Sequence, residues 1–148
     1  MKKIDFKLLD KAQRRLVAAA EAAAKTSYSP YSHFAVGAAL MTVGGKIISA
    51  SNVENAAYGS TICAERAALV SANAMGCRAF RAIAVVAKGK GHARDSMIAP
   101  CGACRQMLFE AARLARRDIE VILCSQDRKT VVLTSVIELL PLPFATKQ

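Results

Sequence analysis

Two short segments place cysteines and a carboxylate at spacings suited to a catalytic metal ion. They are Cys63-Ala64-Glu65 and Pro100-Cys101-Gly102-Ala103-Cys104. A catalytic zinc ion takes three protein ligands and keeps one position open for water, and a C-x-x-C sequence at a helix start brings two sulfurs to one point. Since Cys63 can supply the third ligand, the spacing predicts a zinc site held by Cys63, Cys101 and Cys104.

Charged residues beside these cysteines are suited to proton transfer and charge balance. Glu65 lies two residues beyond Cys63, near enough to reach a metal-bound water without being a ligand, as a proton shuttle must be. Three thiolates on a divalent ion leave a net negative charge. Arg66 and Arg105 each adjoin a ligand segment, and we expect both to donate hydrogen bonds to the sulfurs.

The hydrophobic pattern predicts the elements that position these segments. Apolar residues at helical spacing indicate helices over residues 6–25, 64–76 and 102–117. Apolar runs indicate strands over residues 35–41, 46–50, 82–87, 120–124 and 130–133. The link 125–129 is too short for a parallel crossover, so the last two strands should be antiparallel. This order predicts an α/β fold in which helices cover a mixed five-stranded sheet.

Size and composition indicate one globular domain. The chain has 148 residues, 53% of them hydrophobic and 22% charged, which predicts a single domain over residues 1–148. Charges near the N-terminus interrupt the apolar segment that a signal peptide needs, and the longest uncharged stretch, residues 26–45, is rich in glycine and hydroxyls and is a poor membrane span. Five cysteines, an odd number without an export signal, indicate reduced thiols. We expect a soluble cytoplasmic protein.

The net charge of +10 raises the question of a nucleic-acid partner. The basic residues are scattered over the N-terminus, residues 88–94 and residues 113–117, and aromatic residues make up only 5% of the chain. A binding track for single-stranded nucleic acid interleaves basic and aromatic side chains. The pattern therefore favours a solvated basic surface, and we expect no nucleic-acid partner.

Several longer stretches carry a resemblance to a known family. The order Cys-x-Glu followed by Pro-Cys-x-x-Cys is a signature of zinc deaminases with three cysteine ligands. Over residues 26–144 the chain closely resembles the small homotetrameric cytidine deaminases. The matching stretches are YSPYSHFAVGAAL, NVENAAYG, TICAERAAL, AIAVVA, PCGACRQ and ELLPLPF. The resemblance implies the three-layer α/β fold of that family, with helices on both faces of the sheet, and a homotetramer.

The resemblance also implies an activity, a cofactor and a set of binding residues. Cytidine or 2′-deoxycytidine would be hydrolysed to uridine or deoxyuridine with release of ammonia, a step of pyrimidine salvage. One zinc ion per subunit would supply the hydroxide that attacks C4, and Glu65 would carry the protons. Asn52 and Glu54 are implied to bind the ribose 3′-hydroxyl, and Phe34 to pack on the base. Further implied substrate contacts are Ala64 in the same subunit, and Ala56, Tyr58 and Phe144 reaching into a neighbouring subunit's site.

Each of these assignments has a plainer alternative. Cys101 and Cys104 alone would suit a redox pair, which leaves Cys63 without a role. A structural zinc site would need a fourth ligand. The candidates are Cys77, Cys124, His33 and His92, which we otherwise interpret as buried small residues and loop histidines. Plainer readings also exist for the binding residues: Phe34 and Phe144 as core aromatics, and Asn52 and Glu54 as bridges from a strand end to a turn.

Other functions stay open at this point. A deaminase of RNA or DNA typically resembles a different pattern, with His as the first ligand and a helical crossover before the last strand. A blasticidin-type deaminase shares the fold, although Asn52-Val53-Glu54-Asn55 favours an ordinary nucleoside. A zinc-stabilised RNA-binding module would not need Glu65. Residues 88–99 are longer and more basic than the matching loop of the small tetrameric enzymes, which leaves a phosphorylated or modified nucleoside as a further candidate substrate.

Overall fold

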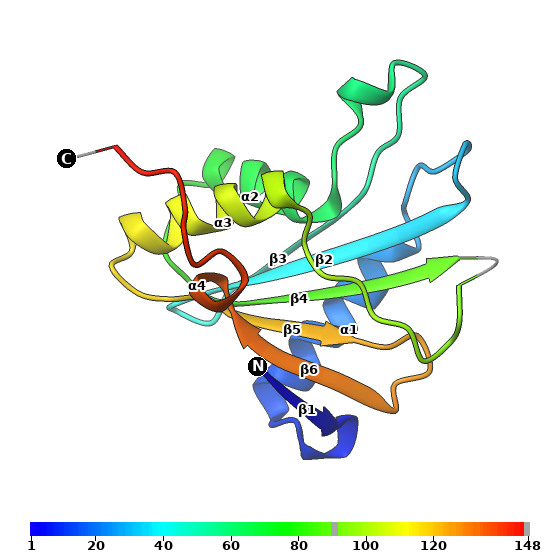
Figure 1. The fold of residues 1–148 in the computed structure, drawn as a ribbon, viewed down its shortest axis with the longest axis horizontal. Coiled ribbons are helices and arrows are strands. Elements are labelled where there is room, and N and C mark those ends of the chain that lie inside the picture. Colours follow the sequence, from blue (N-terminus) through cyan, green and yellow to red (C-terminus); the bar gives the residue numbers. More distant parts are fainter. Residues whose placement is uncertain (90–91, 147–148) are drawn as a thin grey trace.

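A mixed β-sheet of six strands runs through the middle of the molecule (Figure 1). The computed structural model describes residues 1–89 and 92–146. The strands are β1 (Lys2–Asp5), β2 (Phe34–Thr42), β3 (Ile47–Ser51), β4 (Phe80–Gly89), β5 (Glu120–Cys124) and β6 (Thr130–Ser135). They lie in the order β1-β6-β5-β4-β2-β3, in which β4 and β5 are parallel and the other neighbours are antiparallel.

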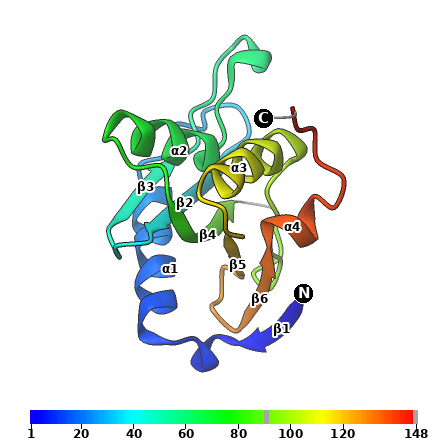
Figure 2. The ribbon, with the colours of Figure 1, turned by 90° about the vertical axis from the view of Figure 1, so that its left-hand side faces the viewer.

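Helices cover both faces of this sheet. They are α1 (Lys11–Ala24), α2 (Ala64–Ala74), α3 (Gly102–Leu114) and the short α4 (Val136–Leu139), with 3₁₀ turns at Phe6–Leu8 and Tyr58–Ser60. Figure 2 shows α1 on one side of the sheet and α3 and α4 on the other. Helix α2 packs beside α3, so the two helices that follow the cysteine segments share one face.

Alternation along the strands builds two cores, because successive strand residues point to opposite faces. In β2, Ala38 and Leu40 belong to the core beneath α2 and α3, whereas Ala39 and Met41 belong to the core beneath α1. The central strands β4 and β5 are buried on both faces, as strands between two helical layers must be. Packing in both cores stabilises the sheet. The two cysteine segments follow strands β3 and β4 of this sheet in the chain.

Helix α1 approaches β2 very closely at a glycine. A Cβ atom added to Gly37 would lie 2.6 Å from the backbone nitrogen of Ala24 and closer still to the carbonyl oxygen of Ala20. Both neighbours are backbone atoms of a helix and cannot rotate away. The distance between α1 and the sheet therefore depends on the missing side chain at Gly37.

The predicted α/β fold is confirmed, but the sheet has six strands where we predicted five. The extra strand, β1, pairs with β6 at an edge of the sheet. We predicted a helix from residue 6, whereas α1 begins at Lys11, because Asp10 and Gln13 form a capping box with bonds of 2.8 and 3.0 Å. Because the helix begins only after this cap, residues Lys2–Asp5 can form a strand that pairs with β6.

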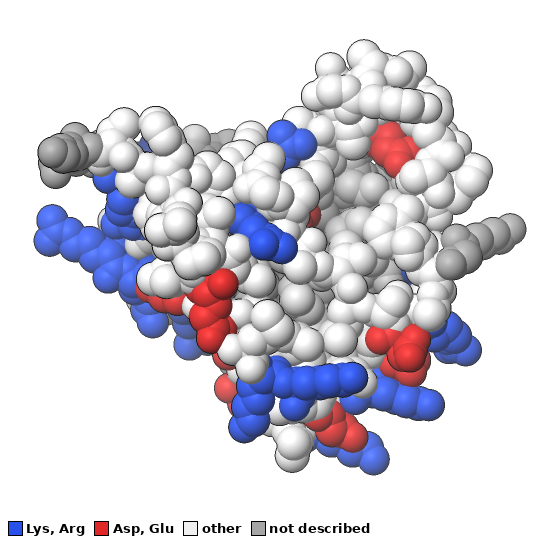
Figure 3. Space-filling model, in the orientation of Figure 1, with Lys and Arg blue, Asp and Glu red and all other residues white. Residues whose placement is uncertain are grey.

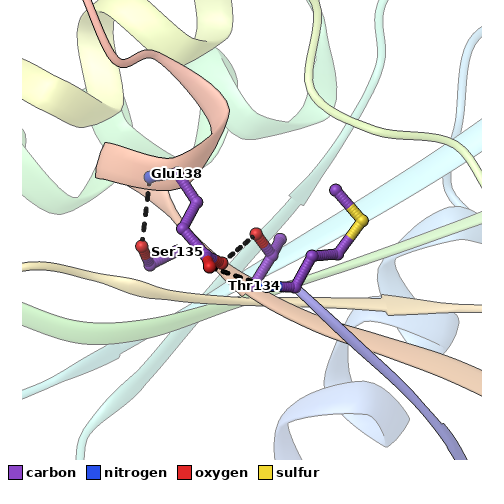
Figure 4. Close-up of polar contacts among 4 residues, drawn as sticks. Thr134, Ser135 and Glu138 are labelled. Atoms are coloured by element: carbon purple, nitrogen blue, oxygen red, sulfur yellow. Dashed lines mark hydrogen bonds and ion pairs between the residues drawn. The ribbon is translucent and has the colours of Figure 1, made fainter.

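Polar contacts of the first residue hold β1 on the sheet (Figure 4). The Oε1 atom of Glu138 accepts a hydrogen bond from the N-terminal amine of Met1 at 2.6 Å, and its Oε2 atom accepts one from the Thr134 hydroxyl at 2.7 Å. Ser135 caps α4 by accepting from the Glu138 N–H at 3.2 Å. Helix α4, which we did not predict, thus supplies the carboxylate that anchors the chain's first residue.

The remaining elements follow the prediction with shifted ends. The β2–β3 hairpin, helices α2 and α3, and the antiparallel pair of β5 and β6 are confirmed. Strand β4 is longer than predicted because it pairs with the whole of β2. The predicted loop over residues 88–99 therefore begins after Gly89, and residues 90–91 of it lie outside the described residues. In the described ranges, none of the helices combines the length and apolar character needed to cross a bilayer.

Candidate metal centre and active site

Three cysteine sulfurs converge at the N-terminal ends of α2 and α3. The Sγ atom of Cys101 lies 4.0 Å from that of Cys63 and 3.5 Å from that of Cys104, and all three lie within 4.8 Å of one another. A tetrahedral zinc ion with Zn–S bonds of about 2.3 Å places its sulfurs about 3.8 Å apart. The predicted convergence is confirmed, and the spacing fits one such ion.

Helix geometry explains how segments so far apart in sequence meet. Cys63 is the N-cap of α2 and Cys101 is the N-cap of α3, both in extended backbone conformation. Cys104 follows in the first turn of α3 and is fully buried. Because α2 and α3 lie side by side, the two helix starts present their sulfurs to the same point.

The cluster gathers groups that oppose one another's ionisation. Burial raises the pKa of the Cys63 and Cys104 thiols, and the neighbouring Glu65 carboxylate raises both further. Partial burial also acts against ionisation of Cys101, but hydrogen bonds, first from the Cys104 N–H, outweigh it and lower the Cys101 pKa. A divalent cation would offset this accumulation of negative charge. The donor set and its charge therefore fit zinc.

Glu65 lies beside the sulfurs and is only 4% exposed. It occupies the first turn of α2, where the helix N-terminus favours the anion. Burial nevertheless raises the pKa of Glu65. Hydrogen bonds from its own N–H and from Cys104, and the attraction of Arg66, lower this pKa, but burial outweighs them. A carboxyl group with raised proton affinity is suited to gaining and losing a proton near neutral pH.

The two arginines that adjoin the ligand segments occupy different places. Arg66 donates to the Thr61 carbonyl oxygen at 2.8 Å. Burial opposes its charge, but the Cys63 sulfur overcomes this and raises the Arg66 pKa. Arg105 instead donates to the carbonyl oxygens of Pro100 at 2.7 Å and Leu139 at 3.0 Å. Its bonds tie the segment before Cys101 to the end of α4.

A cavity of about 250 Å³ opens beside Glu65. Its size lies just below the range of about 300–1,000 Å³ usual for drug-sized ligands, so it suits one small molecule. The predicted site residues that line it are Phe34, Asn52, Glu54, Cys63, Ala64, Glu65 and Cys101. The sequence did not single out the five further lining residues, which are Ser32, Val36, Thr61, Ile98 and Ala99. Only the hydroxyl-rich stretch before Phe34 gave a signal for one of them.

Asn52 is buried, and its amide joins β2 to the preceding loop. Its Oδ1 atom accepts from the Ser27 hydroxyl at 2.6 Å and from the Val36 N–H at 2.8 Å, and its Nδ2 atom donates to the Phe34 carbonyl at 2.9 Å. These bonds match the plainer reading of Asn52 as a bridge. One Nδ2 hydrogen is left over by this count, and it is the group that Asn52 has to offer a ligand.

Glu54 is held by the loop that precedes β2. Its Oε2 atom accepts from the N–H groups of Tyr31 at 2.9 Å and Ser32 at 3.2 Å, and its Oε1 atom accepts from the Ser32 hydroxyl. The Ser32 hydroxyl is the largest cause that lowers the Glu54 pKa. The carboxylate is therefore ionised at neutral pH, and by this count it keeps about one lone-pair site for a further hydroxyl donor.

Ala56, Tyr58 and Phe144 are not among the described residues that line the cavity. The first two belong to a protruding arm, residues 54–61, whose base is closed by paired backbone hydrogen bonds between Val53 and Ile62 at 3.0 and 2.9 Å. Tyr58 is 74% exposed and packs only edge-on against Tyr31, with ring centroids 5.9 Å apart. Phe144 is 76% exposed on the C-terminal tail, so the reading of Phe144 as a core aromatic is wrong.

The charge distribution keeps most basic groups away from this hollow. On the face shown in Figure 3, most lysines and arginines lie along the left, lower and lower right margins and two basic groups lie near the centre, while the hollow beneath the arm is lined chiefly by uncharged side chains. A polynucleotide path would place basic groups along such a hollow. The distribution on this face therefore gives no support to a nucleic-acid substrate.

Comparison with known proteins agrees with this geometry. Residues 10–117 match the family model described as "Cytidine and deoxycytidylate deaminase zinc-binding region". A cytidine deaminase of Halalkalibacterium halodurans is 42% identical over 135 residues, which cover 91% of this chain and 96% of that protein. A probable cytidine deaminase of Dictyostelium discoideum is 43% identical over 116 residues, covering 78% and 73% of the two chains.

A solved structure shares the fold as well as the sequence. The crystal structure of cytidine deaminase from Burkholderia pseudomallei superposes with a TM-score of 0.76 at 47% identity, covering 88% of this chain and 98% of that one. The matched region of the family model contains all three converging cysteines and Glu65. From its sequence, fold and cysteine cluster, this chain belongs to the cytidine and deoxycytidylate deaminase family.

Proposed function

We propose that this chain catalyses the hydrolytic deamination of cytidine and 2′-deoxycytidine to uridine and deoxyuridine, with release of ammonia. The observation that carries the proposal is the juxtaposition of the three-sulfur cluster with buried Glu65 at a cavity lined by Phe34 and Glu54. The cavity suits one small molecule, and its polar groups are acceptors and amide donors of the kind that bind a nucleoside. Residues 1–148 act as one domain built on the continuous sheet.

Glu65 moves the protons of the reaction. Cys63, Cys101 and Cys104 would hold a zinc ion, which when bound would supply a Lewis acid that makes water nucleophilic at neutral pH. Glu65 takes one proton from this water and delivers it to N3 as the oxygen adds to C4. It then takes the second proton of the same oxygen to the amino group, which leaves as ammonia. Its burial supports this role because a raised pKa brings the carboxyl group closer to the working pH, where it can both take up and return a proton.

The cavity walls supply the binding groups. Phe34 packs on the pyrimidine ring, and Ala64, which is fully buried at the start of α2, leaves room for the base above the cluster. The ionised carboxylate of Glu54 accepts from the ribose 3′-hydroxyl, and the remaining Nδ2 hydrogen of Asn52 donates to it. The sugar is thus fixed at the end of the cavity near the arm.

Two arginines support the cluster in different ways. Arg66 stabilises the thiolate of Cys63 through the contact that raises the Arg66 pKa. A direct bond from Arg105 to a sulfur stays a prediction. Its bonds to Pro100 and Leu139 support a positioning role, in which Arg105 fixes the segment that carries Cys101.

The enzyme works in the cytoplasm as a homotetramer with shared sites. The outer surfaces of α2 and α3 form an apolar groove of about 350 Å³ that includes Val70, 60% exposed, and Leu114, 59% exposed. Burying such a patch against a second copy would stabilise an assembly. Ala56 and Tyr58 on the arm and Phe144 on the tail are exposed in the single subunit, which supports their reaching into a neighbour's site.

A matched pair of variants tests the catalytic proposal. Glu65→Gln should lower cytidine turnover by about 10²–10⁴-fold while zinc content and thermal stability stay close to those of the original chain. Glu120→Gln makes the same chemical change on the other face of the sheet and should leave turnover unchanged. Ultraviolet absorbance follows deamination, and metal analysis follows zinc. Full activity in Glu65→Gln would refute the role of Glu65.

A substrate panel separates the alternatives. The same assay is run with cytidine, 2′-deoxycytidine, CMP and blasticidin S. Turnover of the two nucleosides with CMP ignored supports the proposal, whereas preference for CMP or blasticidin S would replace it with the phosphorylated or blasticidin-type reaction. A zinc-containing protein that binds RNA and deaminates none of the four would support the RNA-binding module instead. Light scattering at micromolar concentration tests the tetramer.

A further inference from the structure

The chain between β4 and Cys101 covers one side of the Phe34 ring. The ring centroids of Phe34 and His92 are 4.2 Å apart, with the ring planes inclined by 36°. Phe34 also lines the cavity, whereas His92 is not among the described residues that do so. His92 therefore contacts the ring from outside the cavity, and an effect of His92 on a bound molecule has to pass through Phe34.

A glycine closes another side of the same ring. Phe34 and Gly89 are direct partners in the ladder between β2 and β4. A Cβ atom added to Gly89 would lie 2.6 Å from Cδ2 of Phe34 and 3.4 Å from Cδ2 of His92. The Phe34 ring thus lies against the bare backbone of Gly89, and His92 packs against the same spot. Together they confine the ring and leave its remaining side toward the cavity.

The described part of this loop, residues 92–99, is itself anchored. The carbonyl oxygen of Arg94 accepts from the Asp127 N–H at 2.9 Å, which ties the loop to the turn between β5 and β6. The Ser96 N–H donates to the Ala93 carbonyl at 3.0 Å, and Ile98 packs against the core while lining the cavity. The residues that follow His92 in this loop are therefore held in place by hydrogen bonds and by packing against the core.

We propose that His92 is a positioning residue that strengthens binding of the base by holding the Phe34 ring in place. This inference rests on the proposed function, in which Phe34 packs on the pyrimidine. Aromatic rings in contact add to the stability of a given ring placement beyond simple burial. Without His92 the ring gains freedom, and a bound base has to order it again. The cost falls on binding and leaves the proton transfers at Glu65 unchanged.

The first test separates KM from kcat. His92→Ala should raise KM for cytidine about twofold to tenfold with kcat within twofold of the original value. His92→Phe restores an aromatic ring at this position and should return KM to its original value. Asp95→Ala, an exposed change in the same loop, should have no effect. A KM unchanged in His92→Ala, or a kcat that falls as much as KM rises, would overturn the proposal.

The second test asks whether His92 acts through Phe34. In a Phe34→Ala background, His92→Ala should raise KM no further, because the ring that it holds is gone. Equal effects of His92→Ala in both backgrounds would show that His92 acts independently and would refute the inference. The proposed function fails in a different way: the original chain would then not deaminate cytidine at all, before any variant is compared.

Discussion

Gln106 binds the backbone of Phe144 with both ends of its side-chain amide. Its Nε2 atom donates to the Phe144 carbonyl oxygen at 2.8 Å, and its Oε1 atom accepts from the Phe144 N–H at 3.2 Å. The Phe144 ring is nevertheless 76% exposed. The C-terminal tail is therefore fixed by its main chain on α3 while its side chain faces outward.

Removal of this amide should loosen the tail and leave the domain intact. Gln106→Leu deletes both hydrogen bonds, so we expect the Phe144 amide proton to exchange about tenfold faster or more, while the urea midpoint of global unfolding stays the same. Hydrogen exchange followed by mass spectrometry measures this. Met107→Leu, an exposed change next to it, is the control. Unchanged exchange at Phe144 would mean that other contacts order the tail.

Gly37 should tolerate no side chain. A methyl group there would overlap backbone atoms of Ala20 and Ala24, so α1 would have to move away from β2. We expect Gly37→Ala to lower the free energy of unfolding by at least about 1–3 kcal/mol, measured by urea denaturation. At Gly59 an added Cβ meets nothing within 4 Å, so Gly59→Ala should change stability by less than about 0.5 kcal/mol. Equal effects would contradict the close approach.

The anchor of β1 should weaken in acid. The Met1 amine, followed by the Thr134 hydroxyl, holds the pKa of Glu138 below its ordinary value of 4.5. A depressed carboxyl pKa stabilises the fold fully above the unfolded value, and this contribution is lost as the pH falls through the folded value. The melting temperature of Glu138→Gln should therefore lie below that of the original chain at about pH 6, and the two should converge as the pH falls through the depressed pKa of Glu138.

The control for this pH series is Asp95→Asn, which neutralises an exposed carboxylate in the loop after β4. Its melting temperature should follow that of the original chain at every pH. A difference between Glu138→Gln and the original chain that stays constant down to about pH 3 would show that the anchor does not depend on the charge of Glu138.

Zinc binding should depend on Cys104 and release protons. Cys104→Ser replaces a buried sulfur of the cluster and should reduce the zinc content well below about one ion per chain. Cys77→Ser makes the same change at a half-buried cysteine outside the cluster and should leave the content unchanged. Because burial and Glu65 raise the pKa of Cys63 and Cys104, zinc binding to the metal-free chain at neutral pH should release at least about two protons.

Calorimetry in buffers of different ionisation enthalpy counts these protons. The same coupling predicts that the apparent zinc affinity rises with pH, since the thiols lose their protons more readily. Release of fewer than about one proton per ion would mean that the thiols are already ionised before zinc binds.

The chemistry of the site was predictable because it depends on residue types at short spacings. Cys63 with Glu65, and Cys101 with Cys104, each lie within one helix start, so the sequence itself fixes their local geometry. The buried strands β4 and β5 were equally clear from their apolar runs. Family resemblance, rather than periodicity, pointed to Asn52 and Glu54.

The features that the sequence did not reveal depend on contacts between distant residues. Strand β1 is held by Met1 and Glu138, which are 137 positions apart, and no local pattern marks that pair. The contact of His92 with Phe34 depends on how the loop after β4 folds back. Asn52 was predicted as a ligand group, but its bonds to Ser27 and Val36 show that most of its hydrogen-bonding capacity serves the fold.

Cys63 and Cys101 lie 38 positions apart, and each begins a different helix on the same face of the sheet. An ion shared by their sulfurs would act as a cross-link between α2 and α3, closing a chain loop that contains the whole of β4. Loss of the metal would then remove a cross-link that stabilises the fold, as well as the Lewis acid. Glu65 lies beside the cluster but does not bind the ion. Its replacement should therefore remove proton transfer while the ion continues to link the two helices.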